Sequence, residues 1–348
     1  MKNLLIIYEF DSEYIKRTLT FFKLFSAKEQ IPLNFYAKRW NKNEIEDQTL
    51  YVDENFEVKN EKIKNLNFFQ YSLILSLNSE FEKEKHKKIS DFLKKNKIFQ
   101  LNPFYPSSLA SDKFRTIKKL EKSGINIPFS ILIEFRDRKN LKNIIKKLLS
   151  KKTDGFYIQP NYGTEGKQTY FFTKMQLNEK KNLFIETVNT IIPEQPVIIK
   201  EKRGNIYYFN EKEKNLGYRD VVLRIFIFEW NKKIFSNWCF FEICPLENFP
   251  ISSPYKGGRI LNFNEVKNNL YFKVGENFIK FDLKEEYKIQ IISEIEKIFK
   301  IFNRGIKEKL KIGGMDILLE TDGKNLKTIF LELNPRPSGL DKLSFFQS

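Results

Sequence analysis

Short apolar runs alternate with amphipathic segments over the first hundred residues of the chain. Each apolar run is typical of a strand buried in a parallel sheet, whereas the segments between them repeat their apolar residues at helical spacing. Strands and helices that alternate in this way favour an open α/β sheet with right-handed crossovers. The pattern predicts strands at residues 4–8, 33–37, 71–77 and 98–101 and helices at 12–28 and 80–95.

Longer apolar strands follow beyond a junction at Pro103 and Pro106, and glycine and proline mark their turns. The last two strands flank the turn Asp322-Gly323, which predicts a β-hairpin. We find no internal repeat and no low-complexity linker. The pattern predicts helices at residues 112–123, 139–151 and 285–310, strands at 129–135 and 193–200, a hairpin over 156–172, and long strands over 221–242.

The composition supplies a large hydrophobic core. The chain has 348 residues, which suits two or three packed domains, and 41% of them are hydrophobic, with 35 Phe. No apolar stretch reaches the length of a membrane span, and the amino terminus lacks a signal-peptide cleavage site. We therefore expect a soluble, cytoplasmic protein with no membrane partner.

Cysteine and histidine are too scarce for two common kinds of site. Cys239 and Cys244 lie in one segment, where we expect small core residues rather than a disulfide scaffold. The one histidine, His86, lies in a run of Lys and Glu, where we expect it to be exposed and without function. This scarcity argues against Cys/His zinc sites and against histidine-based catalysis.

The net charge leaves two interpretations open. Sixty-one Lys and Arg against 44 Asp and Glu give +17, a value that suits nucleic acid or another polyanion. The excess is mostly Lys and is mixed with Asn, Ile and Phe along the whole chain. Such a mixture is more typical of solvated basic faces than of one concentrated binding surface.

Polar residues interrupt the apolar strands of the C-terminal hairpin. Asp316 lies in one strand, and Glu332 and Asn334 lie two apart in the other, so their side chains share one face. If the turn at 322–323 closes the hairpin, Asp316 comes near their level. Hard oxygen ligands gathered in this way suit Mg²⁺, and Arg336 would add a fixed cation for a phosphate or carboxylate. The alternative is a hairpin whose polar residues face water, although carboxylates near a core are costly when unpaired.

The sequence GMDILLE followed by FLELNPRPSG resembles the signature of the ATP-grasp superfamily of carboxylate–amine and carboxylate–thiol ligases. The NPR form is similar to carbamoyl-phosphate-synthase-like and amino-acid-ligase-like members. The resemblance implies that Asp316, Glu332 and Asn334 hold the magnesium ions of ATP and that Arg336 lies beside the phosphates. It runs from about residue 107 to the end, and the first hundred residues resemble a pre-ATP-grasp domain.

Two further segments resemble the phosphate-binding parts of this family. SDKFRTIKKLEKSGINIP is similar to the entry helix, which implies that Lys113 reaches the ATP phosphates. DGFYIQPNYGTEGKQTYFF resembles the loop that covers the phosphates. Gly163 and Gly166 would let its backbone approach a phosphate closely, and Thr164 would donate a hydrogen bond to it.

Three more segments resemble the adenine and substrate regions. PVIIKEKRGN is similar to the hinge strand, where backbone groups after Ile199 and the Glu201 carboxylate would serve the base and ribose. RDVVLRIFIFEW resembles the next strand and directs Arg224 toward the acyl phosphate. PYKGGR falls where relatives carry a loop near the acceptor substrate.

One departure from the family pattern concerns a phosphate contact. Members commonly have Lys-Pro where this chain has Gln159-Pro160, and that lysine contacts the ATP phosphates. Loss of a charge-assisted contact costs about 1.5–3 kcal/mol unless a neighbour such as Lys167 or Lys200 replaces it. Without replacement, weak ATP binding or an inactive relative is the expected result.

Together these features predict an α/β and α+β protein with the ATP-grasp fold. We expect an N-terminal pre-ATP-grasp-like α/β domain at 1–105 and an ATP-grasp domain at 106–348. Within the second domain we expect a lid at about 128–198 and a base at about 199–348.

The predicted activity is an ATP- and Mg²⁺-dependent ligation of a carboxylate to an amine through an acyl phosphate, with release of ADP and phosphate. Arg224 and Arg336 would stabilise the reacting groups, and amino acids or peptides are the expected substrates. A catalytically impaired nucleotide-binding protein is one alternative, and a protein that binds nucleic acid or another polyanion is a second. The sequence does not identify the acid, the acceptor or the oligomeric state.

Overall fold

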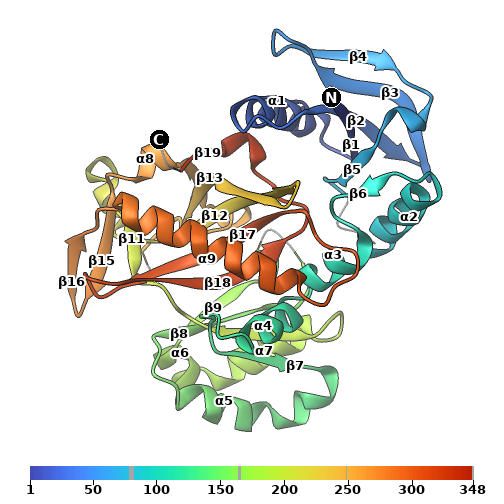
Figure 1. Ribbon diagram of the computed structural model, residues 1–348. Coiled ribbons are helices and arrows are strands. Elements are labelled where there is room, and N and C mark those ends of the chain that lie inside the picture. The colour runs from blue at the N-terminus through green and yellow to red at the C-terminus, as the bar shows by residue number, and fades with distance from the viewer. Residues whose placement is uncertain (78–81, 164–165, 248, 347–348) are drawn as a thin grey trace.

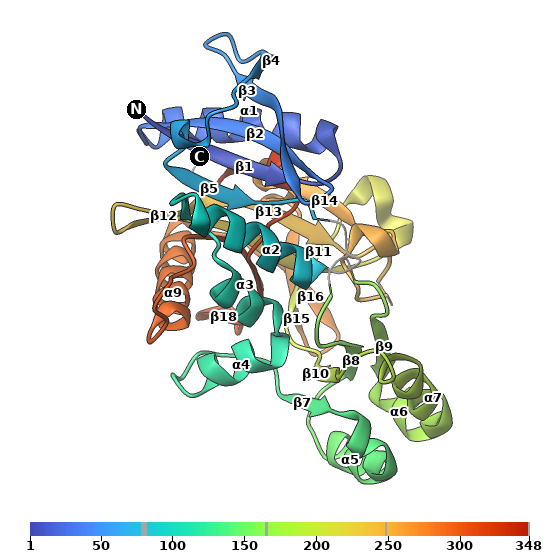
Figure 2. The same ribbon diagram turned by 90° about the vertical axis from the view of Figure 1, so that its right-hand side faces the viewer.

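The computed structural model describes residues 1–77, 82–163, 166–247 and 249–346 of the chain. These residues form three sheets that follow one another along the sequence. Figure 1 and Figure 2 show the six-stranded sheet of the N-terminal part and the four-stranded sheet of the middle part at opposite ends of the molecule. The nine-stranded sheet of the C-terminal part lies between them and connects the two ends.

The six-stranded sheet belongs to the N-terminal part, whose elements are β1 (Lys2–Tyr8), α1 (Ser12–Lys28), β2 (Leu33–Asn41), β3 (Glu44–Val52), β4 (Val58–Lys62), η1 (Leu66–Phe68), β5 (Tyr71–Ile74), α2 (Glu82–Lys95) and β6 (Phe99–Gln100). Strand β1 pairs in parallel with β2 and β5, and β5 with β6, which confirms the predicted α/β sheet. Strands β3 and β4 extend it in antiparallel fashion. The sequence pattern missed them because most of their residues are polar, and β4 is almost entirely exposed.

The four-stranded sheet belongs to the middle part, whose elements are α3 (Phe104–Ser111), α4 (Lys113–Glu121), β7 (Ser130–Ile133), η2 (Phe135–Asn140), α5 (Leu141–Leu149), β8 (Gly155–Pro160), β9 (Tyr170–Thr173), α6 (Lys174–Glu179), α7 (Lys181–Ile191) and β10 (Val197–Glu201). Its order is β7-β10-β8-β9, and the antiparallel β8–β9 pair is the predicted hairpin. Phe156, Ile158 and Ile199 pack against α5 and α7 on one face. The residues that alternate with them therefore point to the opposite face.

The C-terminal part contains β11 (Ile206–Tyr208), η3 (Glu211–Leu216), β12 (Arg219–Trp230), β13 (Lys233–Ile243), η4 (Pro254–Lys256), β14 (Arg259–Asn262), α8 (Phe263–Val266), β15 (Leu270–Val274), β16 (Asn277–Lys280), α9 (Glu285–Asn303), β17 (Ile312–Thr321), β18 (Leu326–Asn334), η5 (Leu340–Lys342) and β19 (Ser344–Phe345). Helix α9 ends at Asn303 rather than at residue 310, because Gly305 takes a positive φ of 75° soon afterwards. None of the helices in the described ranges is both long and apolar enough to cross a membrane.

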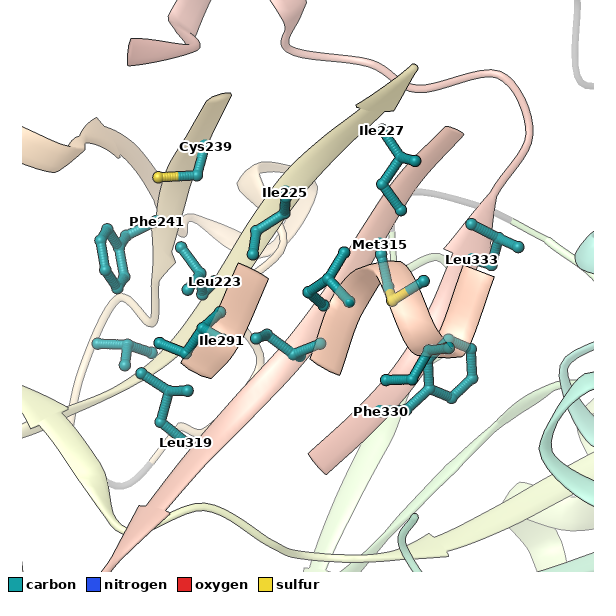
Figure 3. Packing of buried hydrophobic residues seen from close by; sticks show 14 of the residues in the cluster. Leu223, Ile225, Ile227, Cys239, Phe241, Ile291, Met315, Leu319, Phe330 and Leu333 are labelled. Atoms are coloured by element: carbon teal, nitrogen blue, oxygen red, sulfur yellow. The ribbon is translucent and has the colours of Figure 1, made fainter. Parts of the chain in front are cut away.

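One face of the nine-stranded sheet is apolar and is covered by α9 (Figure 3). Alternate residues of β12, β13 and β17 point to this face, so the residues between them point to the other. Arg224 and Asp316 are among those that point away from α9. The buried residues labelled in Figure 3 are Leu223, Ile225, Ile227, Cys239, Phe241, Ile291, Met315, Leu319, Phe330 and Leu333.

A β-bulge in β18 allows apolar and acidic residues to take opposite faces. Asp316 pairs with Glu332, but the next residue, Ile317, pairs with Phe330, which leaves Leu331 as the extra residue. Two residues two apart on a regular strand would share a face. Because of the bulge, Phe330 points into the core while Glu332 points to the polar face, an arrangement found often beside active sites.

Aromatic side chains join α1 to the nine-stranded sheet. Phe226 on β12 meets Phe21 and Phe25 on α1 at ring-centroid distances of 5.5 and 5.3 Å, with interplanar angles of 87° and 88°. Trp238 on β13 lies 5.6 Å from Phe21. Such edge-to-face pairs add about 0.5–1.5 kcal/mol each beyond their burial. The N-terminal part thus shares one hydrophobic core with the strands of the large sheet.

Truncation of Phe226 tests this shared core. Phe226→Ala should lower the free energy of unfolding, measured by urea denaturation, by about 3–5 kcal/mol, because it leaves a cavity between α1 and β12. Phe135→Ala is the matched control, since Phe135 is 63% exposed; it should change the same quantity by no more than about 0.5 kcal/mol. Equal losses in the two variants would contradict this description of the core.

Candidate active site

The predicted metal ligands lie together at the end of the β17–β18 hairpin. Asp316 pairs directly with Glu332, and Asn334 pairs with Gly314. The Nδ2 atom of Asn334 lies 3.2 Å from Asp316 Oδ2 and 3.2 Å from Glu332 Oε1. The structure therefore brings these three side chains into contact, while their role as metal ligands stays a prediction.

A guanidinium group compensates the charge of Asp316. Arg224 pairs with Asp316 across the ladder, and its Nε and Nη2 atoms donate to the two carboxylate oxygens at 2.5 and 2.6 Å. A Cβ on Gly314 would come within 3.1 Å of Pro337 Cβ, so glycine allows the chain after β18 to pass close to β17 there. On the other side of Arg224, Nη1 lies 3.2 Å from Glu242 Oε1 and 3.4 Å from Ser338 Oγ.

Two buried lysines compensate the charge of Glu332. Lys113, at the start of α4, places Nζ 4.0 Å from Glu332 Oε2 and donates to the Gly163 carbonyl at 2.6 Å. Lys200, on β10, donates from Nζ to the Leu331 carbonyl at 3.2 Å. Leu331 is the bulge residue, so its carbonyl is available to this ammonium. Lys200 thus reaches from the four-stranded sheet to the hairpin, and Lys113 reaches it from α4.

Burial and charge act in opposite directions on the two carboxyl groups. Burial raises the pKa of Asp316 to about 8 against the opposing attraction of Arg224. Burial also raises the pKa of Glu332, but Lys113, Lys200 and Arg224 outweigh it and lower this pKa to about 2. The bidentate pair with Arg224 limits the rise at Asp316 without cancelling it. The pKa of Glu332 is low because three cations act on it together.

The donor set fits a magnesium ion. The described ranges contain no cluster of three His, Cys, Asp or Glu side chains that could hold a metal. The donors at this site are instead two carboxylates and one amide. The Asn334 amide touches both carboxylates, and a rotation of this amide by half a turn would present its oxygen at the same place. Three oxygen donors that leave positions open for water and phosphate are what Mg²⁺ prefers.

A hydrogen-bonded cluster holds Lys113 in place. Asp112 caps α4 by accepting from the backbone N–H of Arg115 at 3.0 Å. Its carboxylate also accepts from Asn161 Nδ2 at 2.9 Å and from the Tyr162 hydroxyl at 2.8 Å. Burial, together with this hydrogen bond, raises the pKa of Tyr162 to about 12. The start of α4 is thereby fixed to the segment that follows β8.

The glycine-bearing segment after β8 lies against the loop that contains PYKGGR. Gly163 and Gly166 have positive φ values of 126° and 65°. A Cβ on Gly166 would come within 2.8 Å of Ser253 Cβ, so only glycine permits this approach. Thr164 lies outside the described residues. The segment predicted to cover phosphates and the loop predicted near the acceptor therefore meet.

Gln159 and Lys200 occupy the face of the four-stranded sheet that points away from α5 and α7. The register pairs Gln159 with Ile198 and Lys200 with Tyr157, which places all four on that face. Glu201, one residue on, accepts from the backbone N–H of Phe129 at 2.9 Å. The predicted nucleotide contacts of these residues stay predictions.

Arg336 contacts helix α2, where the structure also corrects the prediction for His86. The Nη1 atom of Arg336 lies 2.6 Å from His86 Nδ1, and its Nη2 atom donates to Glu82, both on α2. His86 is 1% exposed, so the expectation that this histidine is exposed was wrong. The signal was available: His86 lies three and seven residues before the buried Ile89 and Leu93, on the inner face of the helix.

Sequence reasoning missed several residues of the site. Glu242 lies in the apolar stretch FFEIC, where a lone acid is as informative as Asp316 is in GMDILLE, and it is 7% exposed. Ser338 contacts Arg224 across 114 residues of sequence. Asn161 and Tyr162 follow the Gln159-Pro160 pair and show no local pattern. Only the folded chain reveals these last three.

Comparison with known proteins identifies similar structures but no similar sequence. No family model and no curated protein sequence matches this chain. Among solved structures, D-alanyl-alanine synthetase A from Vibrio cholerae matches with a TM-score of 0.57 and 13% identity, over 99% of this chain and 91% of that one. The D-alanine-D-alanine ligase from Coxiella burnetii matches at 0.56 and 10%, over 99% and 88%.

A third matched structure is described as an ATP-grasp ligase. The ATP-grasp ligase PsnB, solved in complex with a minimal precursor, matches with a TM-score of 0.51 and 12% identity, over 98% of this chain and 92% of that one. The chain therefore has the ATP-grasp fold, as the C-terminal motif predicted.

The burial of His86 predicts a specific loss of stability in acid. Burial lowers the pKa of His86 to about 4, so the unfolded chain takes up this proton at higher pH than the folded one. The contribution of the neutral His86 to the free energy of unfolding is complete above about pH 6.5. It falls by about 3 kcal/mol as the pH falls toward 4. Urea unfolding of wild type and His86→Gln at pH 7 and pH 4 measures it. Equal acid losses in both proteins would show that the folded state does not keep His86 neutral.

Proposed function

We propose that this protein is an ATP- and magnesium-dependent ligase that joins a carboxylate to an amine through an acyl phosphate. The ATP-grasp fold supports the proposal, because the proteins of known structure that share it include amino-acid ligases. The observation that carries it is a row of charged side chains on the polar face of the large sheet, in which one arginine stands beside an acidic pair. Across β13, β12, β17 and β18 this row contains Glu242, Arg224, Asp316 and Glu332.

The residues around the acidic pair would bind ATP and its metal ions. Lys113 and Lys200 would bind the phosphates of ATP, covered by the backbone of Gly163 and Gly166. Asp316, Glu332 and Asn334 would hold magnesium, which when bound would neutralise the charge of the polyphosphate. The Glu201 carboxylate and the neighbouring backbone of β10 would serve the ribose and adenine.

Arg224 lies where the reacting groups would meet. A substrate carboxylate oxygen would attack the γ-phosphorus, and ADP would leave with the electrons of the broken P–O bond. An amine nitrogen would then attack the acyl carbon and lose a proton, and inorganic phosphate would leave. The guanidinium of Arg224 would stabilise the oxyanion of that second step. The contact of Gly166 with Ser253 suggests how the covering loop would exclude water from the acyl phosphate.

The cysteines fit a mechanism without a side-chain nucleophile. Cys239 and Cys244 are buried, as predicted, and burial raises the pKa of each thiol well above its usual value. Buried thiols of this kind are inert. The substrates that we propose are amino acids or peptides, because one matched structure is named as a D-alanine-D-alanine ligase and another, a macrocyclase, was solved with a precursor peptide.

Removal of the acidic pair tests the proposal. Calorimetry of ATP binding should show tighter binding with Mg²⁺ than without it in the wild type, and this difference should disappear in Asp316→Asn/Glu332→Gln. Asp322→Asn is the control, because it makes the same chemical change at the exposed turn of the same hairpin. ADP release is then screened with amino acids and peptides. No effect of Mg²⁺ on the wild type would refute the proposal.

Gln159 favours a second candidate, a nucleotide-binding protein that has lost its chemistry. Gln159→Lys should tighten ATP binding about tenfold, because a charge-assisted contact contributes about 1.5–3 kcal/mol, whereas Gln159→Met should not. ADP formation by the wild type would exclude this candidate. Tight ATP binding without ADP formation, with chemistry restored by Gln159→Lys, would establish it.

A further inference from the structure

The residues that follow the predicted magnesium strand are held by the N-terminal part. We call residues 335–338 the post-strand loop; Asn334 immediately precedes it. The Pro335 carbonyl accepts from Asn102 Nδ2 at 3.1 Å, and the Pro337 carbonyl accepts from the Tyr14 hydroxyl at 3.1 Å. The loop is thus attached to α1 and to the junction that follows β6.

Arg336 makes the third attachment and is itself mostly buried. Its side chain is 13% exposed, and that of its partner Glu82 is 23% exposed. The guanidinium donates to Glu82 and to His86 Nδ1, so it spans from the loop to one face of α2. Burying a guanidinium is costly unless its N–H groups are paired. The arrangement therefore depends on both acceptors on α2.

Asn102 makes the anchor rigid. It is fully buried, and its side-chain amide forms two hydrogen bonds with the backbone of Ile74, at 2.7 and 2.9 Å. Its backbone carbonyl accepts from His86 Nε2 at 3.0 Å and from Ser107 Oγ at 3.1 Å. Strand β5, helix α2 and helix α3 therefore all fix the group that holds Pro335.

His86 connects Arg336 to this anchor through a single tautomer. Its Nδ1 faces a guanidinium N–H and must accept, so the proton lies on Nε2, which donates to the Asn102 carbonyl. The imidazole thus joins the post-strand loop to the anchor with one acceptor and one donor. Glutamine offers the same two functions on a side chain of similar length, whereas alanine offers neither.

We propose that the N-terminal part positions the predicted magnesium ligand Asn334 through this polar joint, with His86 and Arg336 as positioning residues. This inference rests on the proposed function. If His86 were lost, Arg336 would be left with an unpaired N–H and the loop with fewer attachments, so Asn334 would no longer be held against Asp316 and Glu332. Groups that orient metal ligands in this way typically contribute 10–100-fold to metal affinity.

The test compares three variants of the full chain: His86→Ala, His86→Gln and Ile89→Ala. Ile89 is the matched control, because it is fully buried on α2 one turn from His86 and packs in the N-terminal core. Calorimetric titration of Mg²⁺ into protein saturated with an ATP analogue that cannot transfer its γ-phosphate measures the metal affinity. Thermal unfolding without ligand measures stability, and binding of the analogue without Mg²⁺ measures the nucleotide site alone.

We expect His86→Ala to weaken Mg²⁺ binding at least tenfold while Mg²⁺-free binding of the analogue changes less than twofold. His86→Gln should restore most of the affinity. Ile89→Ala should lower the unfolding temperature without changing the Mg²⁺ affinity. If wild type binds Mg²⁺ with the analogue but His86→Ala binds it equally well, or no more weakly than Ile89→Ala, this inference fails alone. If wild type shows no such Mg²⁺ binding, the proposed function fails and this inference with it.

Discussion

The arrangement of the site depends on one electrostatic constraint, the placement of two carboxylates side by side where solvent reaches them poorly. Asp316 and Glu332 are directly paired in the β17–β18 ladder, the first buried and the second with a side chain 26% exposed, so water screens their charges only in part. Buried charges are tolerated only when they are paired. Arg224 from β12, Lys113 from α4 and Lys200 from β10 supply the cations, so three separate elements converge on this hairpin. Bound cations of a metal site would add to the same balance.

The described residues of the N-terminal part contribute to the site by packing and by hydrogen bonds, and the charged side chains around Asp316 and Glu332 come from later elements. Aromatic packing of Phe21 and Phe25 on Phe226 fixes α1 against the large sheet. The polar joint at His86 then reaches the loop after β18. Apolar burial provides most of the adhesion and has little direction, whereas the hydrogen bonds have direction and set the position of the loop. Apolar packing therefore attaches the N-terminal part, and hydrogen bonds orient the loop after β18.

The parts of the structure that sequence reasoning predicted are those with local signals. The C-terminal hairpin has alternating residues and an Asp-Gly turn, and Asp316 indeed pairs with Glu332. The same reasoning missed β3 and β4, because their polar residues carry no burial signal. The place of Arg336 beside the phosphates, implied by the family resemblance, stays a prediction. The guanidinium pairs with Glu82, which lies 254 residues earlier in the chain.

The sequence by itself determined the hairpin and its acidic pair through local periodicity, and the ATP-grasp fold class through the resemblance of its C-terminal motif to a known signature, because both signals act over short stretches of chain. Only the tertiary structure decided which cation meets which carboxylate, that Leu331 forms the bulge, and that His86 is buried. These outcomes depend on contacts between elements far apart in the sequence, where the cost of burying an unpaired charge selects among many possible partners. No local pattern encodes that selection.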